Sequence, residues 1–244
     1  MPLILNIDTA TENASICLSQ NGKVIAFEQS VEQKNHASFL QPAIQTILKQ
    51  SSININQLDA VAVTFGPGSY TGLRVGIASA KGICYALDKP LITLNTLEVM
   101  AWAAKQSIES TLFNDNQTPI LFCPMIDARR MEVFVATFNQ QLQMQLATTA
   151  LILQEDSFMT ELTTHQVFFS GNGSVKLKNI LKNTNAYFID VVYSATSMVA
   201  LSEQYFQLQS FASLAYSEPF YGKEFYTPPS KNQYNIKKVD NNHV

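Results

Sequence analysis

Residues 58–87 place an apolar run, a glycine-rich turn and a long helical pattern directly one after another. The run at 61–65, VAVTF, is short and rich in β-branched residues, which predicts a buried strand. In the turn that follows, Gly66 and Gly68 allow close backbone approach, and Pro67 stiffens the chain between them. A helix is predicted up to residue 87, with Ser69 or Thr71 as its cap. A strand that leads straight into a helix restricts the chain to folds that mix both elements.

Two interpretations of this turn remain open. The N-terminus of a helix behind a glycine turn suits a phosphate or carboxylate, but the same parts also build a purely structural turn. The polar turn after the first predicted strand has the same ambiguity, because Asp and Thr favour hydrogen-bonded turns as well as metal or phosphate sites. The candidate residues for a structural turn or phosphate site are Asp8, Thr9, Gly66, Gly68, Ser69, Thr71 and Arg74.

The predicted helix at 72–87 carries only two charges, Arg74 and Lys81, so it lacks a broad solvated face. Small residues recur along it every four positions and would let another helix approach closely. A helix of this kind is either enclosed inside its own domain or buried against a second protein. The helix predicted at 35–49 also has a wide apolar arc. We interpret the two helices as a partner surface formed by His36, Phe39, Leu40, Ala43, Ile47, Gly72, Leu73, Gly76, Ile77, Ala80 and Cys84.

Composition excludes several classes of protein. The net charge is −3 over 244 residues, so the chain lacks the basic stripe of an autonomous nucleic-acid binder. Cys17, Cys84 and Cys123 lie far apart in apolar segments, which predicts buried, reduced thiols and no metal site. His36 has no second ligand at helical spacing and is interpreted as a capping or interface residue. No segment reaches transmembrane length and no signal sequence is visible, so we expect a cytoplasmic protein without a membrane contact.

Predicted elements along the chain favour the α/β class. Three strands joined by hairpins come first, and helices and strands then alternate, which predicts a mixed sheet with helices on both faces. A polar stretch at 108–118 is the natural boundary, after which a second strand pair and further alternating elements follow. We therefore predict two related subdomains, at 1–107 and 118–211, and a C-terminal tail at 212–244. The end of that tail, 231–244, lacks hydrophobic patterning and is expected to be disordered.

Three segments carry a resemblance to a known family: DTATENASICL, GPGSYTGLRVGIASAKG and PLITLNTLEVMA, at 8–18, 66–82 and 90–101. Together they closely resemble the TsaB (YeaZ) family, bacterial proteins that take part in making threonylcarbamoyladenosine on tRNA. The resemblance is strong over residues 3–104. It implies the actin/sugar-kinase/Hsp70-like (ASKHA) fold, in which each subdomain is a mixed sheet with flanking helices. It also implies a non-catalytic subunit that acts with TsaD, the catalytic relative, in threonylcarbamoyl transfer to adenosine 37 of tRNAs reading codons that begin with A.

Departures from the catalytic relative support the non-catalytic interpretation. In that relative two histidines, four residues apart, ligate a metal, whereas the corresponding positions here are Thr96 and Met100. A hydroxyl and a thioether are poor ligands for such ions. Superfamily nucleotide sites usually have a glycine where this chain has Ala10, whose β-carbon would crowd a phosphate. Gly171-Asn172-Gly173 keeps the adenosine-side turn in outline only. The resemblance therefore implies no catalytic residues, no metal and no cofactor.

The resemblance also implies partners. The helices at 35–49 and 72–87 would pack against the equivalent helices of TsaD as a four-helix bundle, and without TsaD the same surface would form a homodimer. The ATPase TsaE would join at the boundary between the subunits, and tRNA would be contacted only through the complex. The alternative is an enzyme of the same fold, either an M22-like peptidase or an ATP-using phosphotransferase. A plain RNA-binding module is a third possibility, which the acidic charge balance disfavours.

Overall fold

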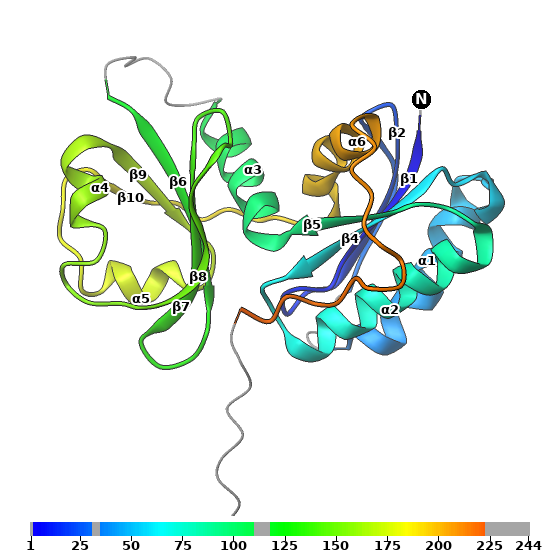
Figure 1. The fold of residues 1–244 in the computed structure, drawn as a ribbon, viewed down its shortest axis with the longest axis horizontal. Helices are drawn as coiled ribbons and strands as arrows, with labels where there is room; N and C mark the ends of the chain where they lie inside the picture. The colour runs from blue at the N-terminus through cyan, green and yellow to red at the C-terminus, as the bar shows by residue number, and fades with distance from the viewer. Residues whose placement is uncertain (1, 31–34, 110–117, 223–244) are drawn as a thin grey trace, which may run out of the picture.

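The computed structural model describes residues 2–30, 35–109 and 118–222, and it contains two five-stranded sheets with flanking helices (Figure 1). The strand order is β3-β2-β1-β4-β5 in the first sheet and β10-β9-β6-β7-β8 in the second. In each sheet three consecutive strands form an antiparallel meander, and two later strands join it in parallel. The two sheets therefore share one topology, which confirms the predicted α/β class and the ASKHA-like architecture.

The first sheet comprises β1 (Leu3–Asp8), β2 (Ser15–Gln20), β3 (Lys23–Gln29), β4 (Ala60–Gly66) and β5 (Leu91–Asn95). Its central strands are buried on both faces, as apolar strands of a parallel arrangement require. Helices α1 (His36–Gln50) and α2 (Tyr70–Leu87) cover one face. The 3-10 helix η2 (Ala195–Met198) and α6 (Val199–Gln207) cover the other. We call this sheet and these helices the first lobe.

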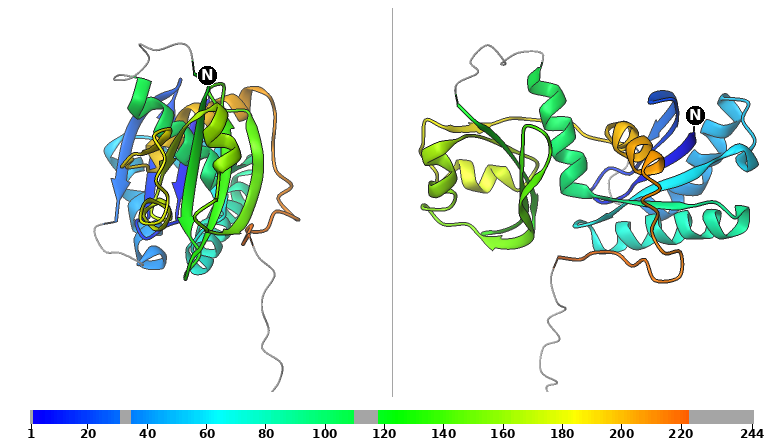
Figure 2. Two further views of the ribbon diagram at one scale, coloured as in Figure 1. Left: turned by 90° about the vertical axis from the view of Figure 1, so that its left-hand side faces the viewer. Right: turned by 45° about the horizontal axis from the view of Figure 1, so that its top comes forward.

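The second sheet comprises β6 (Ile120–Asp127), β7 (Glu132–Asn139), β8 (Met144–Ile152), β9 (Gln166–Ser170) and β10 (Ala186–Phe188). Helix α3 (Thr96–Glu109) packs on one face, and the short helices α4 (Met159–Thr164) and α5 (Ser174–Lys178) lie on the other side (Figure 2). We call this sheet with α3, α4 and α5 the second lobe. A short 3-10 turn, η1 (Ile55–Gln57), connects α1 to β4 in the first lobe.

Packing does not follow chain order at the predicted boundaries. Helix α3 lies almost entirely before the polar stretch at 108–118, but its apolar face, which includes Ile108, belongs to the core of the second lobe. Helix α6 lies within 118–211 but packs on the first sheet. The division into 1–107, 118–211 and 212–244 stays a prediction. The predicted disorder at 231–244 lies outside the described residues. Within the described ranges, no helix has the length and apolar character needed to cross a membrane.

Candidate functional site

The turn after β1 holds a buried carboxylate. The Asp8 side chain is 1% exposed and accepts hydrogen bonds from the Ala10 amide at 3.1 Å and the Thr64 hydroxyl at 2.8 Å. Burial raises the pKa of Asp8 above its ordinary value of 3.8, although these two hydrogen bonds and the charge of His36 act in the opposite direction. The carboxylate oxygens therefore stabilise the local turn and face little solvent.

The glycine-rich turn before α2 packs against that same β1–β2 turn. The Ser69 amide donates to the Ala10 carbonyl oxygen at 2.7 Å, and the Ser69 hydroxyl caps α2 by accepting from the Gly72 amide at 3.3 Å. A β-carbon on Gly68 would lie 2.2 Å from the Ala10 carbonyl oxygen, and one on Gly72 would lie 2.1 Å from the Thr9 carbonyl oxygen. Two main-chain oxygens thus lie against the start of α2, where an anion would otherwise approach. These contacts pack the two turns against each other.

Arg74 does not point into this turn. Its Nε donates to the Tyr221 hydroxyl at 2.9 Å, and its guanidinium carbon lies 4.2 Å from the centre of the Tyr70 ring. The hydrogen bond to Tyr221 raises the pKa of Arg74. Arg74 therefore attaches the C-terminal segment to α2, which differs from its predicted place in a phosphate site. Thr71 is exposed on the first turn of α2.

The two residues that the family resemblance compares with metal ligands, Thr96 and Met100, lie on α3. Thr96 is 0% exposed and Met100 is 4% exposed. The Met100 methyl group approaches Gly171 so closely that a β-carbon on that glycine would be 2.3 Å away. Among the described residues, no three His, Cys, Asp or Glu side chains are grouped so that they could hold a metal ion.

Most of the predicted partner surface faces inward, which corrects the prediction that the small-residue stripe is presented to a partner. The residues that are buried within the chain itself are His36, Leu40, Ala43, Ile47, Gly72, Leu73, Gly76, Ile77, Ala80 and Cys84. His36 donates to the Thr11 carbonyl oxygen at 2.7 Å, and Phe39 is partly buried against the same core. The four-residue spacing exists because α2 lies directly on β4 and on the β1–β2 turn, where larger side chains would not fit.

The opposite face of α2 is the exposed one. A shallow hollow of 610 Å³ is lined by Gln41 of α1, by Ile55, and by mainly small and apolar residues of α2: Ala78, Ser79, Gly82, Ile83, Ala86 and Leu87. Tyr85 is 82% exposed beside it, and a β-carbon on Gly82 would meet no atom within 4 Å. Sequence reasoning missed this face, although Arg74 and Lys81 mark its flank, because charged side chains on an otherwise apolar helix indicate its solvent side.

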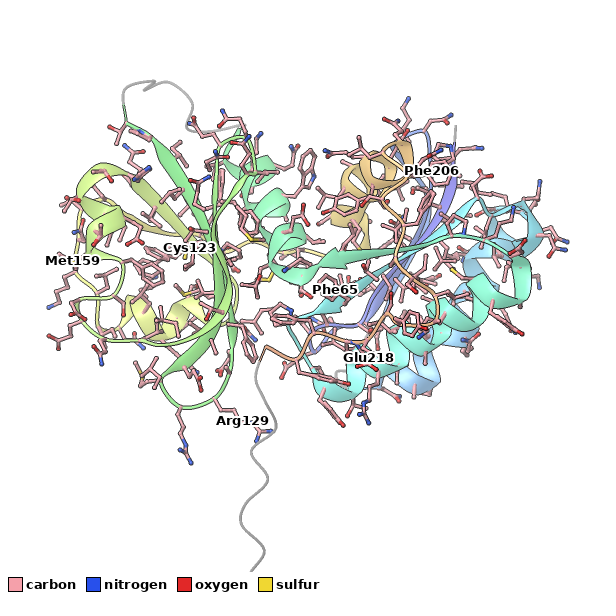
Figure 3. All side chains as sticks on the ribbon, viewed as in Figure 1. Phe65, Cys123, Arg129, Met159, Phe206 and Glu218 are labelled. Atoms are coloured by element: carbon pink, nitrogen blue, oxygen red, sulfur yellow. The ribbon has the colours of Figure 1, made fainter. Side chains whose placement is uncertain are left out.

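A cleft separates the two lobes. One cavity of 470 Å³ lies between the β1–β2 turn and the Gly171–Gly173 turn, and a second of 610 Å³ lies between the start of α2 and the β6–β7 turn. The β6–β7 turn is held by the Asp127 carboxylate, which accepts from the Lys176 ammonium at 2.6 Å, and by the Asn172 side chain, which accepts from the Asp127 amide. Figure 3 shows Arg129 at the outer end of this turn.

Comparison with known proteins gives consistent results. The family model described as tRNA N6-adenosine threonylcarbamoyltransferase, TsaD, matches residues 27–221. The tRNA threonylcarbamoyladenosine biosynthesis protein TsaB of Haemophilus influenzae is 39% identical over 101 residues, 41% of this chain and 42% of that protein. TsaB of Bacillus subtilis is 32% identical over 136 residues, 56% of this chain and 55% of that protein. These matches therefore span about half the length of the relatives.

A solved structure shows the same fold. YeaZ from Pseudomonas aeruginosa superimposes with a TM-score of 0.70 at 22% sequence identity, and the match covers 91% of this chain and all of the other. A second Pseudomonas aeruginosa structure, described as an uncharacterised protein with similarity to peptidase YEAZ, superimposes with a TM-score of 0.74 at 23% identity. At these identities the likeness establishes the two-lobed architecture.

Proposed function

The chain belongs to the TsaB (YeaZ) group within the TsaD family, and from that premise we propose that it is a non-catalytic subunit of a tRNA-modifying complex. In this proposal it acts in the cytoplasm with TsaD and the ATPase TsaE. The complex transfers a threonylcarbamoyl group to N6 of adenosine 37 in tRNAs that read codons beginning with A. The chain contributes a binding surface, and its partner contributes the reacting groups.

One observation carries the non-catalytic role. The Ala10 carbonyl oxygen accepts the Ser69 amide hydrogen, one of the donors that a phosphate at this helix N-terminus would need, and the Thr9 carbonyl oxygen lies against Gly72. Each oxygen carries a partial negative charge, which disfavours a phosphate beside it. Ser69 and Thr71 still line the 610 Å³ cavity, so the β1–β2 turn occupies only one side of this helix N-terminus.

The residues on α3 support the same proposal. Thr96 and Met100 offer a hydroxyl and a thioether at the positions where the catalytic relative is expected to have histidines. Divalent ions of the hard or borderline kind prefer imidazole and carboxylate ligands over both groups. Met100 instead packs in the core of the second lobe.

The exposed face of α1 and α2 is the proposed docking surface for TsaD. Ala78, Gly82 and Ala86 form a row of small residues on this face, and no other described residue has an atom within 4 Å of where a β-carbon on Gly82 would lie. A row of small residues lets a partner helix approach closely, so two helices from each subunit can build a four-helix bundle. Without TsaD, a second copy of the chain would cover the same face in a two-fold dimer. TsaE would bind at the boundary between the subunits, and tRNA would be held by the complex.

Reconstitution tests this function. Purified TsaD, TsaE, this chain and unmodified tRNA are combined with a threonylcarbamoyl donor, and the modified nucleoside is quantified by mass spectrometry. We expect modification only when the chain is present, and an Asp8→Asn variant is expected to support it fully because the carboxylate only stabilises a turn. Full modification without the chain would refute the subunit role.

The cleft cavities favour one competing function, an ATP-using phosphotransferase or a peptidase of the same fold. The 610 Å³ cavity has the volume for a small ligand and is lined by Ser69, Thr71 and Arg129 among others. Isothermal titration of the isolated chain with Mg-ATP separates the two functions. Tight stoichiometric binding would favour the phosphotransferase, and a subunit without its own nucleotide site should give no binding heat.

A further inference from the structure

Residues 212–222, which we call the strap, run from the first lobe along α2 toward the second lobe (Figures 1 and 2). The strap begins on the edge of the first sheet, where the Ala212 amide donates to the Leu91 carbonyl oxygen at 2.8 Å. Along α2, the Lys81 ammonium donates to the carbonyl oxygens of Ala215 at 3.3 Å and Ser217 at 3.1 Å. Figure 3 shows Glu218 on this path beside α2. The strap is therefore attached to the first lobe by main-chain and side-chain contacts.

The glycine-rich turn makes room for the strap. The Phe220 amide donates to the Phe65 carbonyl oxygen at 2.7 Å, at the end of β4. Gly66 has φ of +125°, and a β-carbon there would lie 2.0 Å from the Phe220 carbonyl oxygen. Any other residue at position 66 would be strained and would push the strap away. Gly66 thus serves the passage of the strap as well as the turn before α2.

Tyr221 is enclosed between two side chains of α2. Its hydroxyl accepts from Arg74 Nε at 2.9 Å, and its ring centre lies 4.8 Å from that of Tyr70. The Arg74 guanidinium lies over the Tyr70 ring, so the three side chains form one cation–π and hydrogen-bonded cluster. We call Arg74, Tyr70 and Tyr221 the α2 lock.

The strap then reaches the second lobe. Gly222 has φ of +72°, and a β-carbon on it would lie 2.5 Å from Cε1 of Phe134. The Gly222 backbone therefore lies directly on the ring of Phe134, a residue of β7 that is 8% exposed and belongs to the core of the second lobe. One residue after the α2 lock, the chain contacts the other lobe.

We propose that the strap is a clamp that fixes the opening between the two lobes. The lobes are joined covalently where β5 meets α3 and again through residues 189–194 (Figure 1). Helix α3 also packs on the first lobe, through Val99 and Trp102. The strap adds a further attachment, between α2 and β7. The end of the strap contacts Tyr70 and Phe134, and both residues line the 610 Å³ cavity in the cleft between the lobes. The clamp therefore sets the width of the cleft at that cavity. This role is independent of the tRNA-modifying function proposed above.

Distance measurements between the lobes test the clamp. Spin labels on Lys49→Cys in α1 and Glu155→Cys after β8 would report the separation by double electron–electron resonance, since both positions are exposed. The three native cysteines are buried, so the labels should react selectively at the introduced sites. With the labelled chain diluted into an excess of unlabelled chain, so that a two-fold dimer carries labels on one copy only, we expect one narrow distance distribution.

Variants at the two ends of the strap should broaden that distribution. Tyr221→Ala removes the α2 lock, and Gly222→Ala forces the strap off Phe134 without touching α2. Gly82→Ala is the matched control, because its new methyl group meets open space. An unchanged distribution in both strap variants would overturn the proposal, and so would equal broadening in the control.

A second measurement distinguishes release of the strap from general unfolding of the variant. Tyr221→Phe keeps the ring and loses only the hydroxyl, so circular dichroism should show an intact fold. In this variant, exchange of the Phe220 amide hydrogen with solvent should accelerate about threefold, because a solvent-exposed hydrogen bond contributes only a modest net stabilisation. Unchanged exchange at Phe220 would show that the α2 lock does not hold the strap, and would refute the proposal.

Discussion

The Thr9 hydroxyl donates a hydrogen bond to the Gly72 carbonyl oxygen at 2.8 Å. A β-carbon on Gly76 would lie 2.2 Å from the oxygen of the same hydroxyl group. This one buried side chain ties the β1–β2 turn to the first two turns of α2. The glycines at 72 and 76 are therefore explained by a contact within the chain. The side of α2 that remains exposed is therefore the opposite one.

Substitution of Gly72 by alanine should destabilise the protein by about 1–3 kcal/mol, because the new methyl group would overlap the Thr9 carbonyl oxygen, a backbone atom that cannot move freely. Gly82→Ala in the same helix is the control, and it should be neutral or stabilising by up to about 1 kcal/mol, since alanine favours helices and the site is open. Urea unfolding of both variants measures the difference. Equal free energies of unfolding would contradict the close packing of the two turns.

Asp8 should make the stability of the fold fall as pH rises. Because burial raises the pKa of Asp8 above its ordinary value of 3.8, the native state binds the proton more tightly than the unfolded state. Between these two pKa values the native state holds more protons, so the free energy of unfolding decreases with increasing pH. Asp8→Asn removes this pH dependence of the free energy of unfolding and retains an acceptor oxygen for Ala10 and Thr64.

Urea unfolding at several pH values above 3.8 compares the two proteins. Relative to the Asn variant, the wild type should lose stability as pH increases through this window, and the difference should level off once Asp8 is ionised in both states. A wild type that gains stability relative to Asp8→Asn over the same range would show that the carboxylate is stabilised in its charged form.

The three cysteines should be unreactive in the folded protein. Burial raises the pKa of Cys17 to about 12 and that of Cys84 to about 11, and it raises the pKa of Cys123 well above its ordinary value. Since the thiolate is the reactive form, a chromogenic disulfide reagent at pH 8 should modify none of them rapidly and all three after denaturation. Rapid reaction of any one of these thiols in the native state would contradict the burial of that cysteine in the core of its lobe.

The sequence predicted the strands of the first lobe and both of its long helices, because those segments have clear apolar periodicity and glycine-rich turns. It did not predict which side of α2 is buried. The stripe of Gly72, Gly76, Ala80 and Cys84 fits either a partner helix or a sheet, and periodicity cannot distinguish the two. The hydrogen bond from Thr9 to Gly72 shows that the stripe faces the β1–β2 turn, and this bond joins residues more than sixty positions apart.

The second half was harder to predict. Strand β8 alternates weakly and lies at the edge of its sheet, so few of its side chains need to be apolar, and no strand was predicted there. The strap has no periodicity at all, and its order comes from Arg74, Lys81 and Phe65 on distant elements. Tertiary contacts of this kind leave no local signal in the sequence.

The central claim is that the exposed face of α1 and α2 binds TsaD, and one binding measurement tests it directly. Gly82→Glu places a charge at the centre of that face without disturbing the chain itself, because the site is open. Val192→Glu, at a residue that is 85% exposed away from these helices, is the matched control. Affinity for TsaD from the same organism is measured by titration for both variants and the wild type.

We predict that Gly82→Glu weakens TsaD binding about 30-fold or more, since a charge buried without a partner at an interface typically costs at least about 2 kcal/mol, while Val192→Glu binds as the wild type does. Wild-type affinity in the Gly82→Glu variant would contradict the account and place the TsaD interface elsewhere on the chain.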